Sequence, residues 1–166
     1  MKKRREPRFK SNINPFLERI QERADARIWA LVSWIARMRV MIPLVNRGAC
    51  IACGKPYKFE ELQAGHFHHG KADWHLGNIH GQCNDCNQHH GGRLKEYEKF
   101  LQKKYTPERI QAMSSYAHKV TKYTYAEKVE VERWLKAIKK FMKEEEDQKA
   151  KELIMLYNQW LEGGCK

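Results

Sequence analysis

Residues 50–92 read CIACGKPYKFEELQAGHFHHGKADWHLGNIHGQCNDCNQHHGG and hold four of the chain's five cysteines and seven of its eight histidines. The cysteines form two Cys-x-x-Cys pairs, Cys50 with Cys53 and Cys83 with Cys86, and 29 residues separate the pairs. Two matched pairs at this spacing are typical of a closed tetrahedral zinc site. We therefore predict a structural Zn²⁺ bound by these four thiolates.

Two redox-active dithiols are the alternative interpretation of the same spacing. A redox motif needs a single exposed pair with a low pKa, whereas two matched pairs favour a metal. The zinc would hold together a segment that is too short and too polar to fold around a core of its own.

The net charge of the 166-residue chain is +12, and it is unevenly distributed. Residues 1–49 and 93–143 each carry +8, whereas residues 50–92 carry −1 and residues 144–166 carry −3. A near-neutral centre between two basic segments is typical of a protein that contacts phosphates on either side of a reaction point. Nucleic acid is therefore the expected partner, although lysines that only keep helices in solution would give a similar excess.

The apolar run at residues 28–36 does not indicate a leader or a membrane span. It begins too far from the N-terminus for a signal peptide, and it is too short to cross a bilayer. We expect a cytoplasmic protein with no membrane partner, where reducing conditions favour metal over disulfide at the paired cysteines. Cys165 is left as an unassigned thiol.

A helix is expected before the cysteine-rich stretch. Asn14 and Pro15 are a capping residue and a first-turn proline, and apolar residues then recur at steps of three or four until Pro43. Trp29 and Trp34 lie off this apolar stripe and are expected to pack against a neighbouring element rather than to contact bases.

Helices are also expected after the second cysteine pair. We predict one over residues 87–104, one from Thr106 onward, and a long one that Thr124 and Glu127 open as a capping box. The charged run at residues 143–152 interrupts the last helix, which either projects past the core or breaks there.

The predicted fold is α+β and mostly α, with a small zinc-stapled ββα core between long basic helices. Helical spacing is lost over residues 50–80, where short extended segments appear near residues 62–68 and 78–80. The expected divisions are a basic disordered arm (1–13), an amphipathic helix (14–46), the zinc-stapled core with its following helices (47–120) and a C-terminal helical extension that permits a homodimer (121–166).

The residues between the cysteine pairs resemble the HNH, or ββα-metal, nucleases that carry two zinc knuckles. His66 lies in an extended segment, Asn78 follows in the next, and Asn87 comes directly after the fourth cysteine. More narrowly, the chain resembles the phage NinG/Rap recombination-nuclease family over about residues 47–116. The elements that carry this likeness are C-x-x-C-G, QAGHF, NIHGQC-x-x-CN, Gly92 and Tyr97.

The resemblance implies a role for each of three residues. His66 would be the general base, Asn78 would brace the hairpin that aims His66, and Asn87 would bind a catalytic Mg²⁺ or Mn²⁺. A histidine that titrates near neutral pH suits a general base, and a hard cation with oxygen ligands can polarise a scissile phosphate.

Gly65 departs from the pattern that the resemblance implies. Most HNH sites place an aspartate just before the catalytic histidine as a second metal ligand, and here that position is a glycine. Either His66 itself binds the metal, or the second ligand comes from His68, Asp73 or His90.

The remaining histidines and several basic side chains are expected to lie outside the catalytic centre. His75, His80 and His89 are expected to be structural or solvent-facing rather than catalytic. The expected phosphate contacts are Lys71, Arg93, Lys95, Lys103 and Lys104.

The leading hypothesis is a metal-dependent DNA endonuclease, acting on substrates that include branched recombination intermediates, in the cytoplasm of a bacterial host if phage-encoded. The alternative is a non-catalytic, zinc-stabilised DNA-binding adaptor with a degenerate HNH fold. The third hypothesis is a zinc-stabilised RNA-binding module. Cleavage that depends on a divalent cation and on His66 separates the first hypothesis from the other two.

Overall fold

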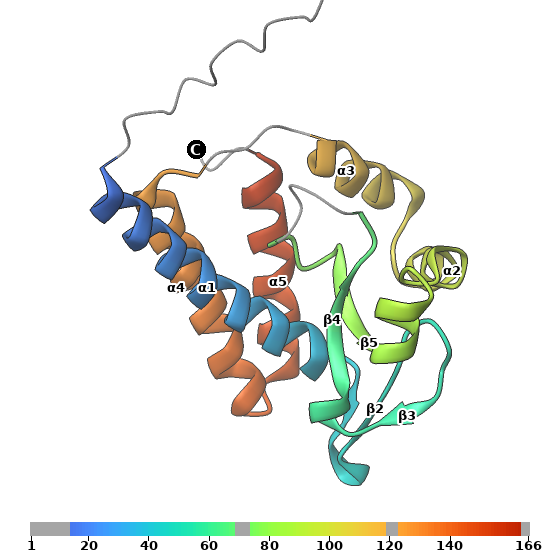
Figure 1. The fold of residues 1–166 in the computed structure, drawn as a ribbon. Helices are drawn as coiled ribbons and strands as arrows, with labels where there is room; N and C mark the ends of the chain where they lie inside the picture. Colours follow the sequence, from blue (N-terminus) through green and yellow to red (C-terminus); the bar gives the residue numbers. More distant parts are fainter. Residues whose placement is uncertain (1–13, 69–73, 119–122, 164–166) are drawn as a thin grey trace, which may run out of the picture.

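The computed structural model describes residues 14–68, 74–118 and 123–163 (Figure 1). The expected arm at 1–13, Lys71, Asp73 and Cys165 lie outside these residues. Helices dominate and two small antiparallel sheets accompany them, so the prediction of a mostly helical α+β fold is confirmed. In chain order the elements are α1 (Pro15–Met38), β1 (Met41–Ile42), η1 (Pro43–Val45), β2 (Arg47–Ala49), β3 (Pro56–Tyr57), η2 (Phe59–Glu61), β4 (Leu62–His66), β5 (Ile79–Cys83), η3 (Asp85–His89), α2 (Leu94–Lys104), α3 (Pro107–His118), α4 (Tyr125–Lys143) and α5 (Asp147–Glu162).

Helix α1 begins where its capping signal predicts. The side-chain oxygen of Asn14 accepts a hydrogen bond from the Phe16 N–H at 2.9 Å, and Pro15 occupies the first turn. The helix ends at Met38, before the predicted limit at Pro43, because the chain turns there into β1. Its buried face packs against α4 and against the β4–β5 hairpin (Figure 1).

The β4–β5 hairpin positions the candidate site. Its antiparallel register pairs Gly65 with His80 and His66 with Ile79. Partners across two strands share a face of the sheet, and successive residues alternate between faces. His66 accordingly stacks on Trp29 of α1, whereas Gly65 lies on the opposite face, where Asn87 of η3 approaches it.

The helix expected over residues 87–104 is interrupted, so that prediction is wrong. A π-helical turn, η3, is followed by Gly91 and Gly92 with φ of 56° and 81°, and α2 starts only at Leu94. These left-handed conformations suit glycine, which has no Cβ to clash with the backbone. The break turns α2 so that Tyr97 points into the hairpin, where it is fully buried.

The C-terminal segment breaks at its charged run, one of the two outcomes expected. Glu145, with φ of 60°, lies in the turn between α4 and α5. Helix α5 therefore folds back along α4 instead of projecting from the core (Figure 1). Tyr157 and Leu161 of α5 are buried as a result.

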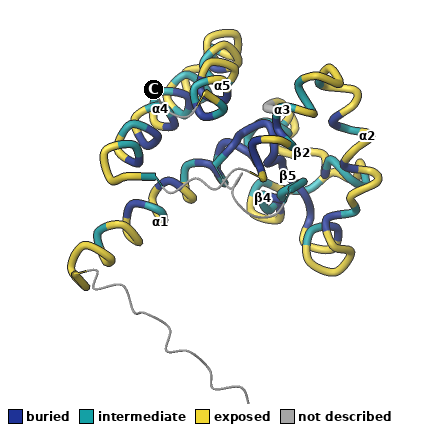
Figure 2. The backbone as a smooth tube through the Cα atoms, turned by 90° about the horizontal axis from the view of Figure 1, so that it is seen from above, coloured by how far each residue is buried: buried dark blue, intermediate teal, exposed yellow. Residues whose placement is uncertain are grey.

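One hydrophobic core joins α1, the hairpin and the last three helices. Burying each large apolar side chain there contributes about 1.5–3 kcal/mol. Figure 2 shows the buried positions gathered where these elements meet, with exposed positions on their outer sides. None of the helices in the described part of the chain is both long and apolar enough to cross a membrane. The large aliphatic core members with 0% exposure are Ile28, Val32, Ile35, Leu76, Ile79, Val131, Leu135 and Ile138.

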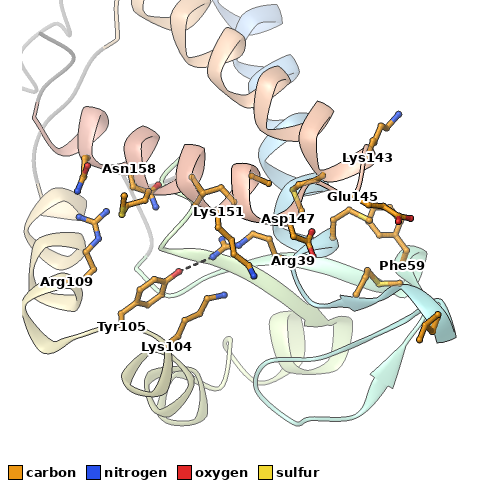
Figure 3. Close-up of a pocket in the computed structure, with 18 of the residues that line it drawn as sticks. Arg39, Phe59, Lys104, Tyr105, Arg109, Lys143, Glu145, Asp147, Lys151 and Asn158 are labelled. Carbon is orange, nitrogen blue, oxygen red and sulfur yellow. Dashed lines mark hydrogen bonds between the residues drawn. The ribbon is translucent and has the colours of Figure 1, made fainter.

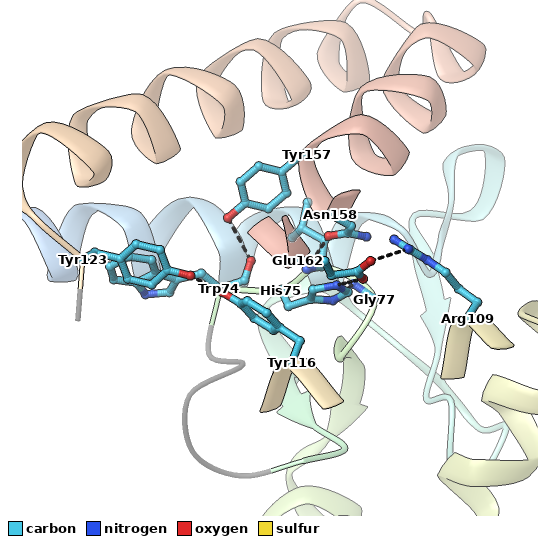
Figure 4. Close-up of polar contacts among 10 residues, drawn as sticks. Trp74, His75, Gly77, Arg109, Tyr116, Tyr123, Tyr157, Asn158 and Glu162 are labelled. Carbon is cyan, nitrogen blue, oxygen red and sulfur yellow. Dashed lines mark hydrogen bonds and ion pairs between the residues drawn. The ribbon is translucent and has the colours of Figure 1, made fainter. Parts of the chain in front are cut away.

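His75 ties the loop between the two hairpin strands to the C-terminal helix (Figure 4). Its Nδ1 accepts a hydrogen bond from the Gly77 N–H at 3.1 Å, so Nε2 carries the proton of the neutral ring and donates to Glu162 at 2.8 Å. The other oxygen of Glu162 accepts from Arg109 at 2.6 Å. His75 is fully buried, in agreement with the structural role expected for it.

We expect the free energy of unfolding to fall as the pH drops below about 6.5, the pKa of an unfolded histidine. Burial lowers the pKa of His75, and burial together with the charge of Arg39 holds the pKa of His80 well below its usual value. The unfolded chain then binds more protons and is favoured in acid. Urea denaturation should show a loss on the order of 1 kcal/mol per histidine between about pH 7.5 and pH 5.5.

His75→Gln removes one of these titrating groups, so the difference in unfolding free energy between the two pH values should shrink. His89→Gln, at an exposed histidine on η3, is the matched control and should leave that difference unchanged. Equal stability of the wild-type chain at both pH values would contradict the account.

Candidate metal centre and hairpin site

The four paired cysteines form a cluster that can hold a metal ion. Their sulfur atoms all lie within 4.8 Å of one another, and Cys50, Cys83 and Cys86 are buried. A tetrahedral zinc with Zn–S bonds of about 2.3 Å holds its sulfurs about 3.8 Å apart, so a modest contraction would close the site. The donor set fits a structural Zn²⁺, as predicted.

Backbone contacts bring the two knuckles together. Gly54 donates its N–H to the Cys50 carbonyl at 2.8 Å, which closes the first turn. Ile51 donates to the Gly81 carbonyl of β5 at 3.1 Å, and this bond sets the first pair beside the second. The β4–β5 hairpin therefore brings the two cysteine pairs together in space, although 29 residues separate them in the sequence.

The thiols of the cluster differ in acidity. Burial raises the pKa of Cys50 and of Cys86. Burial also opposes the ionisation of Cys83, but hydrogen bonds from the Tyr57 hydroxyl and the Cys86 amide outweigh it and lower the pKa of Cys83 to about 7. Zinc binding at neutral pH would thus displace protons from the buried thiols, which makes metal affinity fall in acid.

Asn78 braces the loop that follows His66. Its Oδ1 accepts from the His68 N–H at 2.8 Å, and its Nδ2 donates to the His68 carbonyl at 3.0 Å. The Asn78 carbonyl also accepts from the Phe67 N–H at 3.0 Å. This two-way contact is the geometry that a hairpin-bracing asparagine needs, while the aiming of His66 for catalysis stays a prediction.

Tyr97 connects both strands at the same end of the hairpin. Its hydroxyl lies 3.0 Å from the Gly65 carbonyl, 3.1 Å from the Asn78 carbonyl and 3.0 Å from Nδ1 of His80. The phenol has one proton, and it donates this proton to the carbonyls. The contact with His80 therefore has the opposite direction, and the His80 Nδ1–H donates to the phenol oxygen. Nε2 of His80 then faces Arg39 at 3.4 Å as an acceptor, which agrees with a neutral ring.

Two amide oxygens converge beside Gly65. A Cβ added to Gly65 would lie 1.8 Å from Oε1 of Gln82 and 3.0 Å from Oδ1 of Asn87. The Gln82 amide nitrogen donates to the Gly92 carbonyl at 2.7 Å, and the Asn87 amide nitrogen donates to Gln63 at 2.8 Å. These bonds direct both oxygens toward the same space, and the bond to the Gly92 carbonyl fixes which end of the Gln82 amide is the oxygen.

This convergence fits a hard divalent cation. The Gln82 oxygen is shielded from solvent and has no hydrogen-bond partner in the part of the chain that the structure describes. A buried acceptor without a donor is costly, and a cation would satisfy it. Mg²⁺ and Mn²⁺ prefer such oxygen ligands.

The histidines considered as second metal ligands make other contacts, and their role as ligands stays a prediction. The His68 ring packs against Phe67, with centroids 4.6 Å apart, and the His90 ring lies 3.4 Å from the Asp85 carboxylate. The atoms nearest to the place of a Gly65 side chain belong to Gln82 and Asn87. The third alternative, Asp73, lies outside the described residues.

Sequence reasoning missed Gln82 and the contact between Trp29 and His66. The sequence did carry a signal for Gln82. Neighbouring residues of a strand lie on opposite faces, so Gln82 lies on the face opposite to Cys83, and this is the face on which Gly65 lies. Trp29 does pack against a neighbouring element, as expected, and its ring lies 5.2 Å from the His66 ring at an interplanar angle of 9°. Nothing in the sequence identifies His66 as that neighbour.

The expected phosphate contacts are distributed over α2 and its start. Arg93 has a left-handed backbone at the start of α2, and its Nε atom is shielded from solvent without a partner among the described residues. Lys95 and Lys103 are exposed on α2, and Lys104 borders a separate cleft.

Purified protein should contain one Zn²⁺ per chain by elemental mass spectrometry. Cys86→Ala removes one thiolate and should abolish retention of the metal. The variant should lose about 3–5 kcal/mol of stability, a fraction of the roughly 10–16 kcal/mol with which zinc folds small zinc domains. Cys165→Ala, at the cysteine outside the two Cys-x-x-Cys pairs of the sequence, should keep both metal and stability. Zinc retained at full occupancy by Cys86→Ala would refute the assignment.

Comparison with known protein families matches most of the chain to a family of phage proteins. The family described as Bacteriophage Lambda NinG protein matches residues 30–146, which include the last part of α1, both cysteine pairs and all of α4. No curated protein and no solved structure matched the chain in the corresponding comparisons. The family match covers more than half of the chain, which therefore belongs to the bacteriophage lambda NinG family, a family of phage proteins related to recombination.

Proposed function

We propose that this chain is a metal-dependent DNA endonuclease of the HNH type. The observation that carries the proposal is the convergence of the Gln82 and Asn87 oxygens beside Gly65, one residue before His66. A cation there and the histidine on the neighbouring residue would both lie at the end of β4, where both would contact a phosphate bound over the strand end. The recombination-related family and the net charge of +12 support DNA as the substrate.

His66 would be the general base that removes a proton from the attacking water. Its ring stacks on Trp29, which restricts rotation of the side chain. Asn78 supports this orientation by holding the backbone of His68, two residues further on.

Gln82 and Asn87 would hold the divalent cation, in place of the aspartate that Gly65 replaces. When bound, Mg²⁺ or Mn²⁺ polarises the scissile phosphate and stabilises negative charge on the leaving 3′ oxygen. Both protein ligands are neutral amides, whereas Mg²⁺ sites ordinarily include a carboxylate. The substrate phosphate would therefore supply the missing negative charge, and the cation would bind more tightly in the presence of DNA.

Arg93 supports the position of the phosphate. It follows Gly92, whose added Cβ would lie 3.9 Å from the His66 carbonyl, so the start of α2 adjoins the end of β4. A guanidinium whose Nε lacks a partner among the described residues is suited to a phosphate oxygen. Lys95 and Lys103 on the exposed side of α2 would add contacts further along the backbone.

Purified protein with Mg²⁺ or Mn²⁺ should nick DNA, and a gel assay on linear, flapped and four-way substrates measures this. His66→Ala should lower the nicking rate by at least about a hundredfold, since a general base contributes that much or more, and should leave DNA binding intact. His89→Ala, at an exposed histidine on η3, is the matched control. Undiminished cleavage by His66→Ala would end the assignment.

The non-catalytic adaptor is tested by the same measurement. Salt-sensitive DNA binding without nicking, across several divalent cations and all three substrates, would favour the adaptor with a degenerate site. Preferential binding of RNA over branched DNA in competition would favour the RNA-binding module instead.

Gln82→Ala should weaken Mn²⁺ binding at least about tenfold, since even residues behind the direct ligands of metal sites contribute that much. Mn²⁺ titration followed by electron paramagnetic resonance measures it, with DNA bound to a His66→Ala background so that nothing is cleaved. Gln102→Ala, at an exposed glutamine of α2, is the control. Gly65→Ala should weaken binding similarly, because its Cβ would displace the Gln82 oxygen. Unchanged Mn²⁺ affinity in both variants would exclude this ligand set.

A further inference from the structure

A large cleft lies apart from the hairpin site. It has a volume of about 1350 Å³ and lies between α5, the end of α1 and the connection from α2 to α3 (Figure 3). None of the residues that line it is among Gly65, His66, Gln82 and Asn87. The cleft is therefore separate from the candidate cation site.

Three cationic side chains from three helical segments meet in this cleft. Arg39 follows α1, Lys104 ends α2 and Lys151 lies on α5, and Figure 3 shows them in one region of the cleft. Arg39 donates to the Tyr105 hydroxyl at 3.0 Å, which holds its guanidinium at the cleft wall. In the described part of the chain, none of the three has a carboxylate within 4.0 Å.

The carboxylates of the same cleft do not neutralise these cations. Glu60, Glu145 and Asp147 also line it, yet no ion pair of the described residues joins any of them to Arg39, Lys104 or Lys151. Unpaired like charges repel one another, and bringing them together is unfavourable unless an anion enters. The arrangement points to an anionic ligand.

The acidity of Lys104 agrees with this crowding. Although the residue as a whole is exposed, loss of hydration in the cleft and the charges of Arg39 and Lys151 lower the pKa of Lys104 to about 7. A bound phosphate would favour the protonated ammonium and so raise that pKa.

Apolar and aromatic side chains form other parts of the cleft wall. Met38, Tyr105, Ile154 and Met155 line it together with the three cations. Its volume exceeds the roughly 300–1000 Å³ of a small-molecule pocket, so it has room for more than one nucleotide. Grooves that combine cations with aromatic rings bind single strands, whose unpaired bases can stack on the rings.

We propose that this cleft binds a single strand of nucleic acid, with a backbone phosphate at Arg39, Lys104 and Lys151 and bases against the apolar wall. The inference goes beyond the endonuclease proposal, because strand binding here requires neither the cation nor His66. A duplex keeps its bases stacked inside and would offer this wall only its backbone.

Fluorescence anisotropy with a labelled oligothymidine tests the proposal on the full-length chain. Lys104→Ala and Lys151→Ala should each weaken binding and reduce the slope of log affinity against log salt by about 0.7, the value expected per lost phosphate contact on a single strand. Lys99→Ala removes an exposed charge from α2 outside the cleft and should have a smaller effect on both. Equal losses in all three variants would overturn the proposal.

A second measurement needs no variant. A lysine with a pKa near 7 should react with an amine-acylating reagent faster than Lys99 at neutral pH, and oligothymidine should protect Lys104 selectively in peptide mass spectrometry. Inorganic phosphate at the same phosphate concentration, and a blunt duplex of the same sequence length, should protect it less. Protection by phosphate alone, or by duplex as strongly as by single strand, would overturn the assignment to a single strand.

Discussion

The hydroxyl of Tyr97 contacts the carbonyls of Gly65 and Asn78, one from each side of the hairpin opening, and accepts a hydrogen bond from His80. This buried contact holds together the end of β4, the start of β5 and α2. It forms only because Gly91 and Gly92 break the helix and turn α2 toward the sheet. Both faces of the hairpin depend on it, since it fixes the strand end that carries Gly65 on one face and His66 on the other.

Two kinds of ligand lie at the two ends of this hairpin. Four cysteine sulfurs gather at the end near Cys83, where soft thiolates suit zinc. Two amide oxygens gather beside Gly65, where a hard cation is suited. The zinc cluster would stabilise the fold, because it connects the first knuckle to the hairpin and η3. The amide oxygens would instead leave ligand positions for the oxygens of a substrate.

The tertiary structure places basic side chains of distant segments at two separate sites, one beside the hairpin and one in the cleft. Arg93 lies beside the hairpin, and its shielded Nε atom has no partner among the described residues, whereas Arg39, Lys104 and Lys151 meet in a separate cleft. Arg39 also approaches His80, the partner of Tyr97, so one guanidinium contacts both the cleft and the support of the hairpin. An enzyme that acts on branched DNA would benefit from separate contacts for a strand and for the scissile phosphate.

Local chemistry in the sequence was sufficient for the cysteine cluster, the start of α1 at Asn14 and the capping box at Thr124, because each depends on residues a few positions apart or on a distinctive spacing. The helix break at Gly91 also has a local signal, because the Gly91–Gly92 pair favours a turn, and the helix predicted over residues 87–104 overlooked it. The direction of the Gln82 oxygen and the three-cation cleft were decided by tertiary structure alone. The direction of the Gln82 oxygen depends on a hydrogen bond to Gly92, and the cations come from segments more than 40 residues apart in the sequence, so only the packed chain brings these groups together.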